Sequence, residues 1–234
     1  MSNIVDIKTQ LHVTKFGLNQ ACTVGEAIQD EGGVIVINTV AAKVRIKAGG
    51  NAADVAGGAG AEAVSIFGVD GNWNFVSETI ITKGALVSEL SVNDYLYVFR
   101  GKIADSGAVT NVGNVIIETA AAVVMCQLSA GYGQTERAVF PVFSGYEMHL
   151  TKFRFEGQRN DTVEGEMSLY CYTLGQGITI IHSLAFRGSD HEIVEWEKNH
   201  KRIPEKSLVW VSPIALSASA VIGASFDGDM FRKT

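Results

Sequence analysis

Short apolar runs with a period of two, separated by turn signals, restrict this chain to a β fold. Residues 43–47 alternate charged and apolar side chains, and residues 149–155 place Leu150, Phe153 and Phe155 among polar neighbours. Alternate side chains of an extended chain face opposite sides, so each run has one apolar face. Turn signals recur roughly every 8–12 residues, the spacing expected of a β-sandwich. We therefore predict an all-β protein made of antiparallel strands.

The stretch 130–150 separates a Gly/Ala-rich first half from a more aromatic and more charged second half. The 234 residues suit one large β domain or two small ones. Pro141 cannot donate to a sheet ladder, so its strand is expected to lie at an edge or to bend. We predict two antiparallel β-sandwich modules of jelly-roll type, residues 1–130 with an N-terminal arm and residues 131–234. The predicted module joint and interface residues are Gly131, Tyr132, Gly133, Pro141 and Tyr146.

Composition and charge favour a protein with a sizeable core and without a nucleic-acid surface. Apolar residues make up 47% of the chain and charged residues 19%, which argues against disorder. The 19 basic and 25 acidic residues give a net charge of -6, whereas nucleic-acid binding requires clustered Lys and Arg. No apolar run reaches the ~20 residues of a membrane helix, and no signal peptide is visible. We expect no membrane and no nucleic-acid partner.

The three cysteines are far apart and odd in number, which favours a reducing compartment. Cys126 and Cys171 lie in strand-like runs and are expected to be small core residues. The glycine-rich stretch 48–63 lacks the GxxxxGK[ST] pattern of a phosphate-binding loop, and the next lysine is Lys83. We predict that this stretch is a flexible loop that adds little to the fold.

Residue spacing provides no metal or catalytic motif. His182, His191 and His200 lie near several glutamates but show neither HExxH nor HxH spacing, so we interpret them as surface histidines. The sequence from Asp227 to Asp229 is interpreted as a tight turn, because a calcium-binding EF-hand loop needs further ligands. No GxSxG nucleophile elbow occurs. We expect no cofactor and no enzymatic activity.

Several short motifs resemble a family of virion structural proteins of tailed bacteriophages. The segment 13–19 (VTKFGLN), the segment 67–73 (FGVDGNW) and the turn 130–135 (AGYGQT) resemble the family's "KFG-x-N", "GLD-x-NW" and "AGYGQT" motifs. Residues 140–146 occupy the place of its "VPAGK"-like strand and turn, but Phe140–Phe143 is longer than the usual strand. The resemblance runs along most of the chain.

The resemblance implies a non-enzymatic β-sandwich protein on the virion, and first of all a head decoration or cement protein. Members of the family form homo-oligomers, so the expected partners are further copies of this chain and the major capsid protein or another virion protein. The chain would be made in the host cytoplasm and carried on the capsid surface. A tail, neck or fibre-attachment component is the first alternative. A carbohydrate-binding or hydrolytic β-sandwich is the second, although no aromatic face beside paired carboxylates is apparent.

Overall fold

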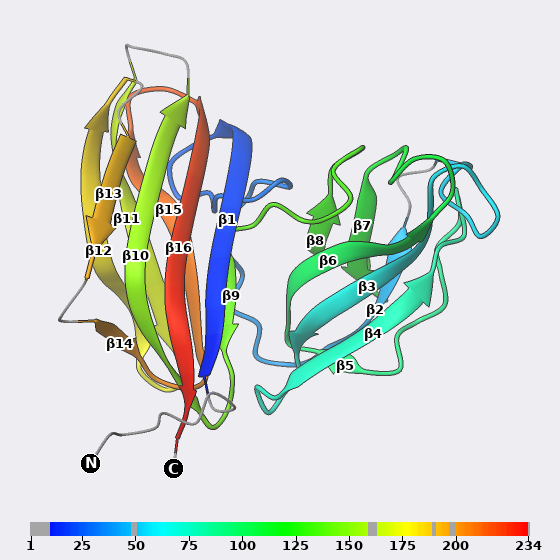
Figure 1. Cartoon of the computed structure of the whole chain (residues 1–234), viewed down its shortest axis with the longest axis horizontal. Helices are drawn as coiled ribbons and strands as arrows, with labels where there is room; N and C mark the ends of the chain where they lie inside the picture. The colour runs from blue at the N-terminus through cyan, green and yellow to red at the C-terminus, as the bar shows by residue number, and fades with distance from the viewer. Residues whose placement is uncertain (1–9, 48–50, 159–162, 189–190, 197–199, 234) are drawn as a thin grey trace, which may run out of the picture. The chain divides into compact units, whose positions relative to one another are not determined.

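The computed structural model describes residues 10–47, 51–158, 163–188, 191–196 and 200–233 of the chain (Figure 1). Sixteen β-strands supply the regular structure of this described part, in which no helix occurs. A search of the same residues therefore finds no apolar helix of membrane-spanning length. All of the strand pairings are antiparallel, which confirms the predicted all-β class.

The chain forms two compact units, but their boundaries differ from the predicted division after residue 130. Unit 1 contains the chain up to Ile28 and again from Ala138, whereas unit 2 contains Gln29–Arg137. The physical reason is that β1 (Gln10–Cys22) pairs along its length with the last strand, β16 (Ala220–Arg232). The segment expected to begin the first module therefore belongs to the same unit as the C-terminus, and unit 2 is inserted between them.

Unit 1 contains two antiparallel sheets. The first has the order β1-β16-β10-β13, with β14 also paired to β10, and the second has the order β12-β11-β15-β9. The strands not yet defined are β9 (Val139–Val142), β10 (Tyr146–Gln158), β11 (Glu164–Thr173), β12 (Gly177–Arg187), β13 (His191–Glu195), β14 (Lys201–Ile203) and β15 (Ser207–Leu216). Figure 1 shows β16 and β10 at the middle of the first sheet, with β1 beside β16.

The core of unit 1 follows from strand alternation. On β10 the side chains of Met148, Leu150, Phe153 and Phe155 are buried, and a register shift between Leu150 and Lys152 keeps both pairs on the same face. Phe155 contacts Phe186 of β12, with ring centroids 4.4 Å apart, so the two sheets share this aromatic contact. On β10 and β16 the large apolar side chains, such as Phe153 and Phe226, therefore lie on the core face of the first sheet.

Unit 2 also contains two antiparallel sheets, with the orders β5-β2-β7-β8 and β4-β3-β6. Its strands are β2 (Ala42–Lys47), β3 (Ala61–Val69), β4 (Phe75–Ile81), β5 (Asp94–Tyr95), β6 (Tyr97–Ser106), β7 (Val115–Thr119) and β8 (Val124–Leu128). Ile46 of β2, Ile66 of β3 and Ile117 of β7 are fully buried members of one apolar cluster. Both sheets therefore contribute to a single core.

Two local predictions were wrong because side chains and strand neighbours outweigh local composition. Among the described residues of the glycine-rich stretch, Asp54 is fully buried, and its carboxylate accepts hydrogen bonds from the backbone N–H groups of Ala61, Val112 and Gly113 at 2.8–2.9 Å. The stretch is thus anchored to the unit rather than loosely attached. The Asp227–Asp229 segment is not a turn, since β16 continues through it between β1 and β10.

Candidate functional site

The predicted joint glycines lie within unit 2. Gly131 and Gly133 have φ values of +81° and +69°, a conformation that glycine adopts readily. Their N–H groups donate to the backbone oxygen and the side-chain Oδ1 of Asn111, at 2.9 and 3.0 Å. Tyr132 between them is 49% exposed. The turn was predicted correctly, but it is closed against Asn111 and is not the place where the chain changes units.

Pro141 and Tyr146 lie in unit 1. Pro141 lies on β9, opposite Leu208 of β15. β9 is the edge strand of its sheet, as expected for a strand that contains a residue without an N–H donor. Tyr146 begins β10, and its ring meets that of Phe143 edge-on at 6.2 Å. The five predicted site residues are therefore divided between the two units and do not converge on one site.

The chain passes between the units at two neighbouring positions, where Gln29 pairs with Arg137. Arg137 is only 5% exposed. Its guanidinium donates to Gln29 Oε1 at 2.8 and 3.1 Å, and its Nη1 donates to the backbone oxygens of Val98 and Met125 at 2.7 and 2.6 Å. Arg137 Nε also lies 3.4 Å from Glu31 Oε1. This network holds the two ends of unit 2 together.

Three carboxyl groups near these ends have raised pKa values. Burial is the main cause for Asp30, Glu31 and Glu136, and the charge of Asp30 raises the pKa of Glu136 further. The charge of Arg137 partly offsets the effect of burial on Glu31. Burial also raises the pKa of the Cys126 thiol to about 12, which keeps it protonated and unreactive at neutral pH. The arrangement indicates a structural role.

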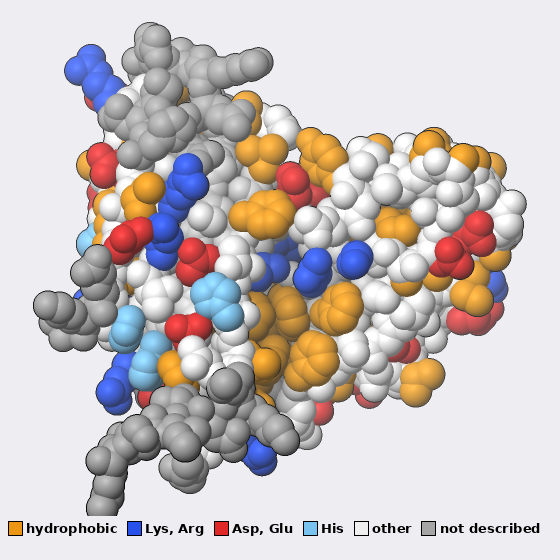
Figure 2. All heavy atoms as spheres, in the orientation of Figure 1, with side chains coloured by type: hydrophobic (Ala, Val, Ile, Leu, Met, Phe, Trp, Pro, Cys, Tyr) orange, Lys and Arg blue, Asp and Glu red, His pale blue; other side chains and the backbone are white. Residues whose placement is uncertain are grey.

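A row of polar side chains crosses the outer face of the first sheet of unit 1. His12, Asp229 and His149 lie opposite one another on β1, β16 and β10, and His12 Nδ1 is 2.9 Å from Asp229 Oδ1. His149 Nε2 is 2.8 Å from Glu147 Oε1. Figure 2 shows histidines beside acidic side chains over these strands. Among the described residues, no group of three His, Cys, Asp or Glu side chains is placed to hold a metal ion.

The predicted surface histidines differ in their surroundings. The ring of His200 stacks on that of His149 with centroids 6.1 Å apart, and the ring of His182 meets Trp196 edge-on at 5.7 Å. The side chain of His191 lies outside the described part of the chain. His12 and His149 carry no spacing signal in the sequence, because their neighbours Asp229 and Glu147 become adjacent only through strand pairing or alternation.

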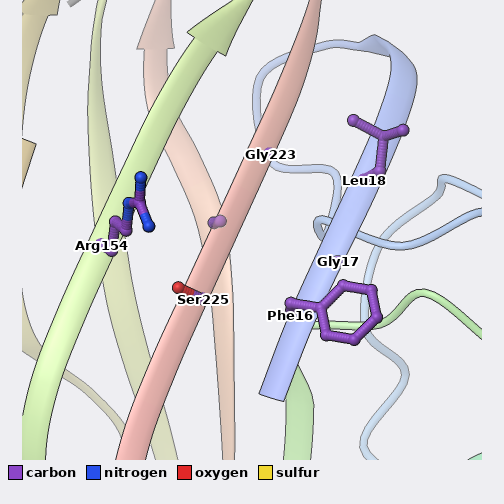
Figure 3. Close-up of a pocket in the computed structure, with 7 residues that line it drawn as sticks. Phe16, Gly17, Leu18, Arg154, Gly223 and Ser225 are labelled. Carbon is purple, nitrogen blue, oxygen red and sulfur yellow. The ribbon is translucent and has the colours of Figure 1, made fainter. Parts of the chain in front are cut away.

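A shallow trough lies farther along the same face, between β1 and β10 (Figure 3). Phe16 and Leu18 of β1 form one side and Arg154 of β10 forms the other. Ser225 and its small neighbours on β16 form the floor. Register explains the arrangement, because Ser225 pairs with Phe16 on one side and with Arg154 on the other. The sequence gives no direct sign of this trough, since its walls are separated by more than a hundred residues.

An apolar loop, defined as residues 86–92, lies along β2 in unit 2. Ser88 and Ser91 are buried and form the hydrogen bonds that a neighbouring strand would form with β2. The N–H groups of Ser88 and Ser91 donate to the backbone oxygens of Ile46 and Val44, respectively, at 2.8 and 2.7 Å. Their hydroxyl groups accept hydrogen bonds from the N–H groups of the same two residues at 2.8 Å. The exposed fractions of the apolar side chains are large: Leu86 71%, Leu90 47% and Val92 84%.

The backbone of the apolar loop is also fixed on its other side. Glu78 of β4 accepts a hydrogen bond from the N–H group of Val92 at 2.8 Å. The loop is thus held rigidly while its large apolar side chains face solvent, an arrangement typical of an interaction surface. A sequence signal for it exists, since four apolar residues recur in the seven residues 86–92, interrupted by two serines and Glu89.

Comparisons of this chain with family models, curated proteins and solved structures gave no match.

Proposed function

We propose that this chain is a non-enzymatic structural protein of a tailed-bacteriophage virion, a decoration or cement protein of the head. In this proposal each unit is a β-sandwich of jelly-roll type. The protein stabilises the capsid surface by contacts with the major capsid protein and with further copies of itself. The short sequence motifs at 13–19, 67–73 and 130–135 support the proposal by resemblance.

The apolar loop is the structural observation that carries the proposal. Leu86, Leu90 and Val92 expose apolar surface that would be more stable against another protein, at roughly 25 cal/mol per Å² removed from water. Because Ser88 and Ser91 already fix the loop, docking requires little additional ordering of its backbone. A contact of this size is weak alone, but it becomes strong when symmetry repeats it over a particle.

The copy number of the protein in purified particles tests the proposal. Quantitative gel analysis should show an abundance of the same order as the major capsid protein, and removal of the protein should lower the heat or osmotic resistance of the particles. A band corresponding to a handful of copies would instead favour a tail, neck or fibre-attachment component. Absence from the particle would contradict both assignments.

A loop variant tests the contact itself. The triple substitution Leu86→Ser, Leu90→Ser and Val92→Ser should leave the isolated protein folded but prevent its attachment to stripped particles. The matched control is Val34→Ser, Val36→Ser and Val40→Ser, which changes three other strongly exposed apolar residues of unit 2. Equal attachment of the loop variant and the control would exclude the apolar loop as the docking surface.

A further inference from the structure

The trough on unit 1 has two walls of opposite chemistry. Phe16 is 45% exposed and Leu18 is half-buried, so the β1 wall offers carbon surface. Across the floor, Arg154 is exposed and carries a planar guanidinium with five N–H donors. Ser225 adds a hydroxyl at the floor between the walls. A ligand that fits has one apolar side and one side rich in hydrogen-bond acceptors.

The size of the trough restricts the ligand to one small ring. Its volume is about 250 Å³, somewhat below the roughly 300–1,000 Å³ of pockets that enclose drug-sized molecules. Its walls stand on β1 and β10, which are separated by one intervening strand and hence by roughly 10 Å. The floor stays low because Gly223 and Ser225 present little or no side chain to this face.

A sugar ring meets both requirements. The C–H face of a pyranose packs against an aromatic or aliphatic side chain, and its hydroxyl oxygens accept hydrogen bonds from the opposite wall. Arg154 adds a preference for a carboxylate, because a guanidinium binds a planar carboxylate through two parallel N–H bonds. The guanidinium has enough donors to bind such a group while it keeps a contact within the protein.

We propose that the trough formed by Phe16, Leu18, Arg154 and Ser225 binds a single pyranose residue that carries a carboxylate. This site is independent of the apolar loop, which lies in unit 2. It gives the protein a second binding activity, directed at acidic glycans, that does not depend on the proposed place in a virion.

Nuclear magnetic resonance titration of the full chain with methyl β-glucuronide tests the site, with methyl β-glucoside as the neutral counterpart. Few contacts surround one ring, so the expected Kd for the glucuronide is of the order of 1–10 mM. The shifted amides should be those of residues 16–18, 154 and 223–225. The glucoside should bind about tenfold more weakly, since it lacks the group that Arg154 recognises. Equal binding of the two sugars would overturn the proposed preference for a carboxylate.

Variants separate this site from non-specific sugar contact. Phe16→Ala and Arg154→Gln should each weaken glucuronide binding by about tenfold or more, and Ser225→Leu should block the floor. The matched control is Phe75→Ala, because Phe75 is a similarly exposed phenylalanine, at 48%, on unit 2. Unchanged melting temperatures would show that the variants remain folded. No amide shifts, shifts confined to other surfaces, or equal losses in the Phe75 variant would overturn the proposal.

Discussion

The guanidinium of Arg137 and the side-chain oxygen of Gln29 form two hydrogen bonds, at 2.8 and 3.1 Å, beside the two positions where the chain passes between its units. The two residues are at opposite ends of unit 2 in sequence. Their contact therefore closes the inserted unit on itself, and the same guanidinium also satisfies the backbone oxygens of Val98 and Met125. The buried Arg137 side chain thus joins the two ends of unit 2 to strands β6 and β8.

Replacement of Arg137 should destabilise unit 2 strongly. Arg137→Met leaves Glu31 buried without its cation and leaves two backbone oxygens without their donor, so we expect a loss of about 3–5 kcal/mol in the free energy of unfolding. Urea unfolding measures the loss. The control is Arg100→Met, because Arg100 is exposed and donates to the Gln134 side chain, so its loss should cost less than about 1 kcal/mol. Similar losses in both variants would contradict a special role for Arg137.

The stability of unit 2 should fall as pH rises above about 4, where carboxyl groups of the unfolded chain ionise. Burial raises the folded-state pKa values of Asp30, Glu31 and Glu136, so the folded state retains protons that the unfolded state releases. The stabilisation by these protons is complete below the unfolded pKa values. It is lost as pH rises through the folded values.

Urea unfolding at pH 5 and pH 8 measures this dependence. The fluorescence of Trp73 reports on unit 2 when Trp196→Phe and Trp210→Phe are present in every protein compared, because the chain has three tryptophans. Glu31→Gln should flatten the pH dependence. The control is Glu62→Gln, at a half-buried carboxylate that accepts a hydrogen bond from the N–H group of Gly57, and it should leave the pH dependence unchanged. An increase in stability from pH 5 to pH 8 would refute this explanation.

Removal of the Asp54 carboxylate should destabilise unit 2 although Asp54 lies in a glycine-rich stretch. Asp54→Ala leaves three backbone N–H groups without their acceptor, and each such group costs about 1–3 kcal/mol when it stays buried. We expect a loss of at least about 3 kcal/mol, measured by urea unfolding. Asp94→Ala at an exposed position is the control. A loss as small as that of the control would restore the prediction of a loosely attached loop.

The 131–133 turn should resist a β-branched substitution. Gly133 has a φ of +69°, and a Cβ placed there would lie 3.3 Å from Thr110 Cγ2, so Gly133→Val should cost about 1–3 kcal/mol in stability. Gly131 has open space around it, and Gly131→Asn should be milder because asparagine tolerates this backbone region. Melting temperatures compare the two variants, with Gly71→Ala as a control where an added Cβ meets only Ala41 at 3.6 Å. A neutral Gly133→Val variant would contradict the predicted strain.

Local pattern was sufficient for several features of the fold. Alternation in residues 149–155 identified a strand, because side-chain direction along a strand follows a period of two. It did not reveal the register shift between Leu150 and Lys152, which places Leu150 on the same buried face as Phe153 and Phe155. The missing N–H of Pro141 likewise predicted an edge strand or a bend, and β9 is an edge strand. These predictions needed no knowledge of which strands pair.

Strand partners, unit boundaries and binding surfaces depended on the tertiary structure. The sequence of β1 does not show which of its faces is buried, since Lys15 and Asn19 are buried whereas Phe16 is exposed. Nor does it show that Gln10 lies opposite Phe231, because many strands of similar pattern compete for the same pairing. That long-range pairing places the N-terminal strand in the unit of the C-terminus and brings Phe16, Ser225 and Arg154 into one row. The sequence by itself thus determined that the chain forms strands, whereas the pairing of distant strands decided their buried faces, the two units and the trough.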